Sequence, residues 1–110
     1  MGARTAIALA LAMFWAPGFA AAAEHVVSAS RTDFSPSRIG VRVGDTVTWV
    51  NDVPVAHEMA FEGDPVGRGR PLSLFMKHKP VSVTVTRPGT YPYKCNWHGM
   101  HGVIEVLPEQ

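Results

Sequence analysis

A cysteine, two histidines and a methionine lie within seven residues near the C-terminal end of the chain: Cys95, His98, Met100 and His101. Thiolate and imidazole ligands suit copper, and a thioether suits reduced copper in particular. Two imidazoles and one thiolate in a plane, with a weak axial ligand, form a blue-copper electron-transfer site. A second equatorial imidazole must come from elsewhere in the chain, and His57 is the candidate. The sequence therefore predicts one copper ion, cycling between Cu(I) and Cu(II), held by His57, Cys95 and His98.

Each of these residues has a more ordinary interpretation when it is taken alone. A lone cysteine in a strand is usually a buried apolar residue, a lone histidine is usually a surface residue, and Cys-x-x-His is a weak motif. Here Gly-Met-His-Gly follows the motif at the edge of an apolar final strand. Cys95 is also the only cysteine, so it has no internal disulfide partner. A metal that joins distant segments would occupy the thiol and stabilise a small domain.

The N-terminal segment is typical of a secretory signal peptide. Arg4 supplies a positive start, Thr5 to Phe19 is almost wholly apolar, and four alanines follow at positions 20–23. The apolar run is short for a membrane span, which needs roughly 20 residues. We expect residues 1–23 to be the signal peptide, with cleavage after Ala23 or one residue to either side. Residues 24–110 would then form an exported, periplasmic domain without membrane insertion.

Alternating apolar residues predict short strands in the remaining chain. The alternation covers residues 39–43, 46–49 and 81–85, and the last strand is expected over Gly102 to Leu107. Turn residues separate these runs, and residues 63–71 are expected to form a surface loop. Short strands without a helical pattern point to an all-β antiparallel sandwich or barrel.

Charge and motifs exclude several function classes. Without Arg4, nine basic residues balance nine acidic ones, which does not favour nucleic acid or an anionic membrane as a partner. A catalytic Ser/His/Asp set, paired acids or a phosphate-binding loop is not apparent in the sequence. We therefore do not expect an enzyme.

Two segments carry a family resemblance. Residues 34–51 and residues 88–95 resemble the early strands and the cysteine-bearing strand of small cupredoxins, the type 1 copper proteins that include amicyanins, plastocyanins and pseudoazurins. The resemblance extends from Phe34 to Val106. It implies a Greek-key β-sandwich, one-electron transfer at a type 1 copper, and transient docking of redox partners near His98. We expect a monomer.

The chain departs from the cupredoxin pattern beside its predicted ligands. Cupredoxins often have Pro before the first ligand histidine and Asn after it, whereas Ala56 and Glu58 flank His57. That Asn usually helps to tie the two ligand loops together, and such supporting contacts orient metal ligands. Trp97 also stands before His98, where Pro or Gly is usual.

The axial ligand has two candidates. Counting forward from His98 places the axial position on His101, and counting back from the final strand places it on Met100, with one loop residue missing. The second register fits more of the chain, so Met100 is the preferred axial ligand and His101 the alternative. The positions it fits are Gly99, Met100, Gly102, Ile104 and Val106. An imidazole would favour Cu(II) and a more tetragonal geometry than a thioether does.

Three functions remain open from the sequence. The first is a one-electron carrier between redox proteins. The second is a periplasmic copper-binding or trafficking protein without an electron-transfer role, which the unusual ligand loop and the Met100–His101 pair motivate. The third is a metal-free interaction sandwich. Zinc could also occupy such ligands, so the metal needs to be measured.

Overall fold

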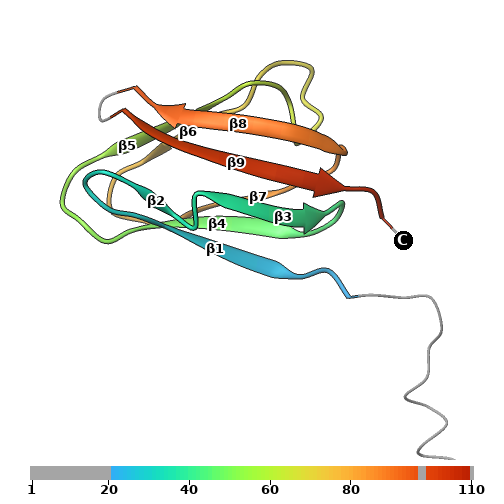
Figure 1. The fold of residues 1–110 in the computed structure, drawn as a ribbon, viewed down its shortest axis with the longest axis horizontal. Coiled ribbons are helices and arrows are strands. Elements are labelled where there is room, and N and C mark those ends of the chain that lie inside the picture. Colours follow the sequence, from blue (N-terminus) through green and yellow to red (C-terminus); the bar gives the residue numbers. More distant parts are fainter. Residues whose placement is uncertain (1–20, 97–98, 110) are drawn as a thin grey trace, which may run out of the picture.

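The computed structural model describes residues 21–96 and 99–109. His98 and Trp97, and residues 1–20 of the predicted signal peptide, lie outside the described residues. The described chain forms nine strands and contains no helix (Figure 1). The described residues thus include no helix with the length and apolar character needed to cross a membrane.

The strands form two sheets that pack face to face. One sheet has the order β2-β1-β4-β7, and the other has the order β3-β9-β8-β5-β6 (Figure 1). The first sheet consists of β1 Glu24–Ala29, β2 Phe34–Ser35, β4 Thr46–Asn51 and β7 Val81–Thr84. The second consists of β3 Arg38–Arg42, β5 His57–Phe61, β6 Ser73–Met76, β8 Gly89–Cys95 and β9 Met100–Leu107. The prediction of an all-β sandwich is confirmed.

The predicted strands are present, but their pairing is not wholly antiparallel. β1 pairs with β4 in parallel, and β3 pairs with β9 in parallel, while the other strand pairs are antiparallel. A period of two residues indicates which side chains face the core, but it carries no information on strand direction. The antiparallel part of the prediction was therefore wrong for these two pairs.

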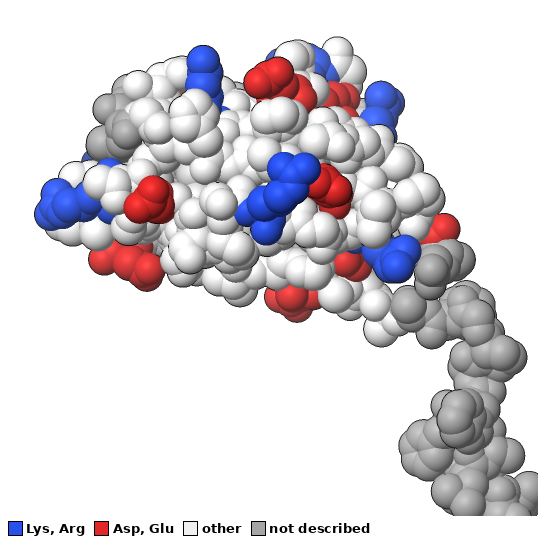
Figure 2. Space-filling view, in the orientation of Figure 1, with Lys and Arg blue, Asp and Glu red and all other residues white. Residues whose placement is uncertain are grey.

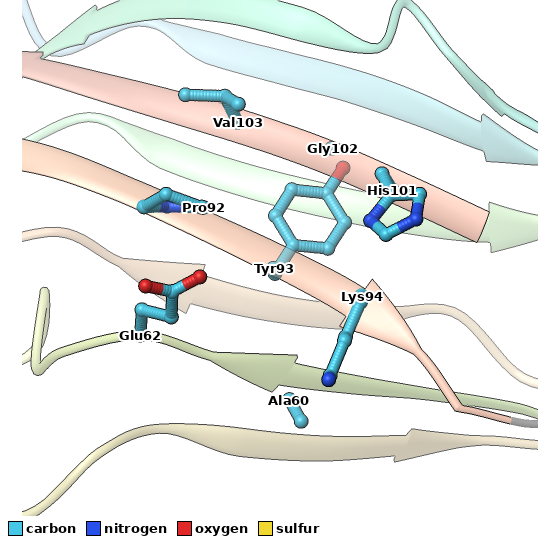
Figure 3. Close-up of a pocket in the computed structure, with 8 residues that line it drawn as sticks. All are labelled: Ala60, Glu62, Pro92, Tyr93, Lys94, His101, Gly102 and Val103. Atoms are coloured by element: carbon cyan, nitrogen blue, oxygen red, sulfur yellow. The ribbon is translucent and has the colours of Figure 1, made fainter. Parts of the chain in front are cut away.

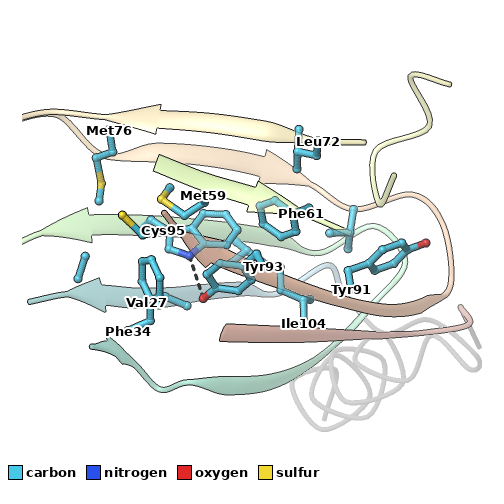
Figure 4. Packing of buried hydrophobic residues seen from close by; sticks show 14 of the residues in the cluster. Val27, Phe34, Met59, Phe61, Leu72, Met76, Tyr91, Tyr93, Cys95 and Ile104 are labelled. Atoms are coloured by element: carbon cyan, nitrogen blue, oxygen red, sulfur yellow. Dashed lines mark hydrogen bonds between the residues drawn. The ribbon is translucent and has the colours of Figure 1, made fainter. Parts of the chain in front are cut away.

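An aromatic cluster fills the space between the sheets. Tyr93 stacks on Phe61 with ring centroids 4.8 Å apart and meets Trp49 edge-on at 5.7 Å (Figure 4). The Trp49 indole donates a hydrogen bond to the Tyr93 hydroxyl at 3.2 Å. Burial raises the pKa of Tyr93 to about 12, although the bond from Trp49 opposes the shift. This polar bond fixes how β8 lies over β4, because both of its partners are buried.

Gly102 allows the Tyr93 ring to lie against β9. Gly102 is the partner of Tyr93 in the β8–β9 ladder, and a Cβ at this position would lie 2.2 Å from the Tyr93 ring. A side chain cannot be accommodated at that distance, so the glycine is required for this packing. The contact fixes the register of β9, which begins at Met100.

Candidate metal centre

Two of the predicted ligands meet inside the sandwich at one end. His57 is the first residue of β5, and Cys95 is the last residue of β8. These strands run antiparallel, with Ala60 opposite Lys94, so the start of β5 lies beside the end of β8. The Cys95 Sγ atom lies 3.9 Å from the His57 Nδ1 atom, and neither residue has solvent-exposed surface. The structure thus brings together two donors that are 38 residues apart in the chain.

The two axial candidates lie on opposite faces of the same sheet. Met100 is opposite Cys95 in the β8–β9 ladder and is 1% exposed, so it shares the inner face with the thiol. His101 is opposite Lys94, and both are exposed on the outer face. There they line a surface pocket with Glu62 (Figure 3). Successive residues of a strand alternate between faces, which is why neighbours in the sequence are separated here.

The donor pair fits a copper ion. Bonds of ~2.3 Å to a thiolate and ~2.0 Å to an imidazole, the lengths usual at zinc, would separate the two donor atoms by ~3.7 Å at an angle of about 120°. The observed separation of Sγ and Nδ1 is 3.9 Å. Sulfur and imidazole donors in a dry setting suit copper chemically. Among the described residues, no group of three His, Cys, Asp or Glu side chains could hold a metal. The third predicted ligand, His98, lies outside that part of the chain.

Two further methionines contribute to the apolar surroundings of the thiol. Met59 and Met76 are buried, at 0% and 1% exposure, and their side chains lie near Cys95 (Figure 4). Met76 comes from β6, directly opposite His57 in the β5–β6 ladder. The sulfur atoms therefore add polarizable, weakly polar packing that excludes water from the donor pair.

Asn51 fixes the loop that leads to His57. Its side-chain amide donates hydrogen bonds to the carbonyls of Val55, at 2.6 Å, and Lys77, at 2.7 Å. Its side-chain oxygen accepts a bond from the Val53 amide at 3.2 Å. One side chain therefore holds residues 53–55 against the turn between β6 and β7. The sequence indicated a turn at this asparagine, but it gave no sign of the contact with Lys77, which lies 26 residues away.

A hydrogen bond between Asn96 and Glu58 links the two ligand loops in this chain, where cupredoxins usually use an Asn after the first ligand histidine. The Asn96 side-chain amide donates to the Glu58 carboxylate at 3.5 Å. Glu58 follows one predicted ligand and Asn96 follows the other, so this bond links the two ligand-bearing segments. The bond is long and exposed, so it restrains the loops weakly.

Comparison with known proteins agrees with this geometry. A family model described as copper binding proteins, plastocyanin/azurin family, matches residues 21–107. Amicyanin from Paracoccus denitrificans is 34% identical over 83 residues, which cover 74% of this chain and 63% of that protein. Plastocyanin from Scenedesmus fuscus is 32% identical, with 66% of this chain and 85% of that protein covered. The chain spans less than two thirds of the amicyanin sequence.

Solved structures show the same fold. The oxidised form of an amicyanin variant with a methionine replaced by lysine has a TM-score of 0.67 at 32% identity, covering 76% of this chain and 82% of its own. The Cu(I) form of a methionine-to-alanine amicyanin variant has a TM-score of 0.67, covering 84% and 90% of the two chains. These matches confirm the predicted cupredoxin-like, Greek-key β-sandwich and copper as the cofactor. The paired donors, the fold and the family match together show that the chain belongs to the plastocyanin/azurin family of copper-binding proteins.

Proposed function

We propose that this protein is an exported one-electron carrier with a single type 1 copper, and that it has no enzymatic activity of its own. The observation that carries the proposal is the 3.9 Å approach of Cys95 Sγ to His57 Nδ1 in a fully buried position. His57, Cys95 and His98 would hold the metal in a plane, with Met100 as the axial ligand. The similarity to amicyanin and plastocyanin supports the same role.

The chain's part in electron transfer is to keep its ligands fixed. Bound copper supplies a centre that accepts and releases one electron, and little movement of the ligands makes that exchange fast. Cys95 and Met100 are held by strand pairing, and His57 begins a strand whose preceding loop Asn51 restrains. Burial of His57 and Cys95 keeps water away from the donors. These elements do not need to rearrange when the charge of the site changes.

The position of Met100 supports its choice as the axial ligand over His101. Met100 points to the same side of the sheet as Cys95, whereas His101 points to the outer face. We expect Met100→Leu to change the ratio of the visible absorption bands and the EPR hyperfine splitting. His101→Ala is the matched control and should leave both unchanged. A spectral change in His101→Ala alone would favour the imidazole instead.

Redox partners would dock transiently at the end of the sandwich near His98. Such encounters bury small interfaces, below about 1,200 Å² in total. Pro54 is exposed and Val55 is half-buried at this end, so both can contribute apolar contact. Met100 is 1% exposed, so it cannot add to this apolar surface. Basic and acidic side chains are interspersed on the face shown in Figure 2, which does not favour a strongly charged partner.

A visible and EPR spectrum of the copper-loaded mature protein tests the site. We expect an intense thiolate-to-copper charge-transfer band in the wild type and no such band in Cys95→Ser. Met59→Leu is the matched control, because Met59 is buried in the same region but is not a proposed ligand. If the wild type binds copper without that band, the site is not a type 1 centre.

The buried methionines also support the second candidate, a copper-binding or trafficking protein. Met59, Met76 and Met100 are buried in the same core as the thiol, and thioethers favour Cu(I). An electron carrier must bind both oxidation states and cycle between them, whereas a copper carrier must release the ion. Voltammetry of the loaded protein separates the two roles. A reversible wave supports electron transfer, and its absence together with copper release to a chelator supports trafficking.

A further inference from the structure

Ala23 is anchored to the sandwich by both of its backbone groups. Its N–H donates to the Asp45 Oδ1 atom at 2.9 Å, and its carbonyl accepts a hydrogen bond from the Thr46 N–H at 3.0 Å. Ala21 and Ala22 are exposed and belong to no strand. Ala23 is therefore the first described residue that these hydrogen bonds attach to the folded domain.

The partner of Ala23 is an almost buried carboxylate. Asp45 is 7% exposed, and its Oδ2 atom accepts a bond from the Arg42 N–H at 3.0 Å and lies 2.9 Å from His25 Nε2. The hydrogen bond from Ala23 is the largest cause that lowers the pKa of Asp45 to about 2. A carboxylate in this position is stabilised by a positive partner, since buried charges are usually paired. His25 supplies a full positive charge only when its imidazole is protonated.

The sequence alone leaves more than one bond open for removal of the leader. A signal peptidase requires small residues three positions and one position before the cleaved bond. Of the three bonds within one residue of the expected site, cleavage after Ala22 or after Ala23 satisfies this requirement, whereas cleavage after Glu24 places a charged residue next to the bond. The contacts of Ala23 distinguish the two remaining bonds. Cleavage after Ala23 would remove both the donor to Asp45 and the acceptor for Thr46.

We propose that the leader is removed between Ala22 and Ala23 and that the new α-ammonium group of Ala23 forms an ion pair with Asp45. A signal peptidase hydrolyses the Ala22–Ala23 peptide bond, and water supplies the hydroxyl of the Ala22 carboxyl group and the hydrogen of the Ala23 amine. The inference rests on the proposed export of the protein. This bond lies within the range that the sequence predicted, one residue before the cleavage after Ala23 that it favoured.

The ion pair would improve on the contact that the uncleaved chain makes. An α-amino group has a pKa of about 7.7–8.0, so it is largely protonated at neutral pH. The Ala23 amide already donates to an ionised carboxylate, and an ammonium group in its place adds a full positive charge to that hydrogen bond. Processing at this bond would therefore replace an amide–carboxylate hydrogen bond with an ion pair beside the start of β1.

Intact mass and N-terminal sequencing of the full chain expressed with export to a bacterial periplasm test the cleavage. We expect the mature protein to begin at Ala23. A mature protein that begins at Glu24 or elsewhere overturns the proposal while leaving export intact. An unprocessed chain overturns both this inference and the export on which it rests. Copper binding is measured separately on the same sample. A protein that fails to bind copper can therefore be distinguished from one that is cleaved at another bond.

Acetylation of the α-amino group, in the wild type and in Asp45→Asn, tests the ion pair in the processed protein. Selective acetylation of the α-amino group, checked by mass, should lower the urea midpoint of the wild type but leave that of Asp45→Asn unchanged. Asp33→Asn is the matched control, because Asp33 is exposed. Acetylation should lower its urea midpoint by as much as it lowers that of the wild type. An equal loss in wild type and Asp45→Asn, or no loss in the wild type, would overturn the pair.

Discussion

The two ends of the sandwich hold small polar clusters of different kinds, one partly buried and one fully buried. At one end, before β4, the Asp45 carboxylate takes bonds from two backbone amides and contacts the His25 imidazole. At the other end, beyond β4, the Cys95 thiol and the His57 imidazole approach to 3.9 Å among buried methionines. The first cluster combines a carboxylate with an imidazole, and the second combines a thiol with an imidazole. Only the second offers the thiolate that a type 1 copper site requires.

The difference shows how one fold separates stability from function. The Asp45 cluster ties the turn after β3 to the N-terminal strand by hydrogen bonds within the chain, so we expect it to stabilise the protein with or without metal. The His57–Cys95 pair joins β5 to β8 and should stabilise the protein mainly when an ion bridges it.

Copper should stabilise the wild type strongly and Cys95→Ser hardly at all. A ligand at about 1,000 times its Kd adds about 4 kcal/mol to the free energy of unfolding, and the thiolate supplies the strongest bond to the ion. Urea unfolding with and without copper measures the increment in wild type, Cys95→Ser and Asp45→Asn. Asp45→Asn should keep the full increment because its change lies at the other end. Equal increments in wild type and Cys95→Ser would contradict the assignment of the thiol as a ligand.

Asp45→Asn should destabilise the copper-free protein by about 2 kcal/mol at neutral pH, since hydrogen bonds to charged groups contribute about 1.5–3 kcal/mol each. The pKa of Asp45 falls from 3.8 to about 2 on folding, mainly through the bond from Ala23. A lowered pKa gives stability that is present above pH 3.8 and lost as the pH falls through about 2. The Ala23 and Arg42 amides and the His25 imidazole are the groups that face this carboxylate.

The pH dependence of that loss provides the check. Urea midpoints of wild type and Asp45→Asn should differ clearly at pH 4 and above and converge toward pH 2. Asp33→Asn should follow the wild type throughout, because Asp33 is exposed. A difference that stayed constant down to pH 2 would mean that ionisation of Asp45 contributes nothing.

Asn51→Ala should cost about 1–3 kcal/mol, because it removes a side chain that satisfies two carbonyls and one amide in the loop before His57. It should also broaden the EPR spectrum of the loaded protein, as the loop samples more than one conformation. Asn96→Ala is the matched control, since it removes an asparagine with one long bond. A stable Asn51→Ala variant with an unchanged spectrum would show that strand pairing alone positions His57.

The contrast between the two ends also explains what the sequence could predict. His57 and Cys95 could be paired from their residue types, because few functions need both in an all-β chain. The parallel pairing of β1 with β4 could not be predicted, because alternation shows only the buried face. The choice between Met100 and His101 depends on which residue faces Cys95 across the ladder. The Asp45 cluster could not be predicted, because Gly44-Asp45 has the composition of an ordinary turn. Its partner Ala23 also lies at the end of the segment that is typical of a signal peptide.

Glu58→Gln should have the smallest effect, because the bond from Asn96 is long and exposed. We expect a loss of free energy of unfolding below about 0.5 kcal/mol, the usual range for surface substitutions. If the Glu58–Asn96 bond nevertheless holds the two ligand loops together, the variant should release copper faster to a chelator than wild type does. Glu62→Gln, a nearby change on the outer face, serves as the control. Equal release rates in all three proteins would mean that the β5–β8 ladder and Asn51 keep the ligand loops together without this contact.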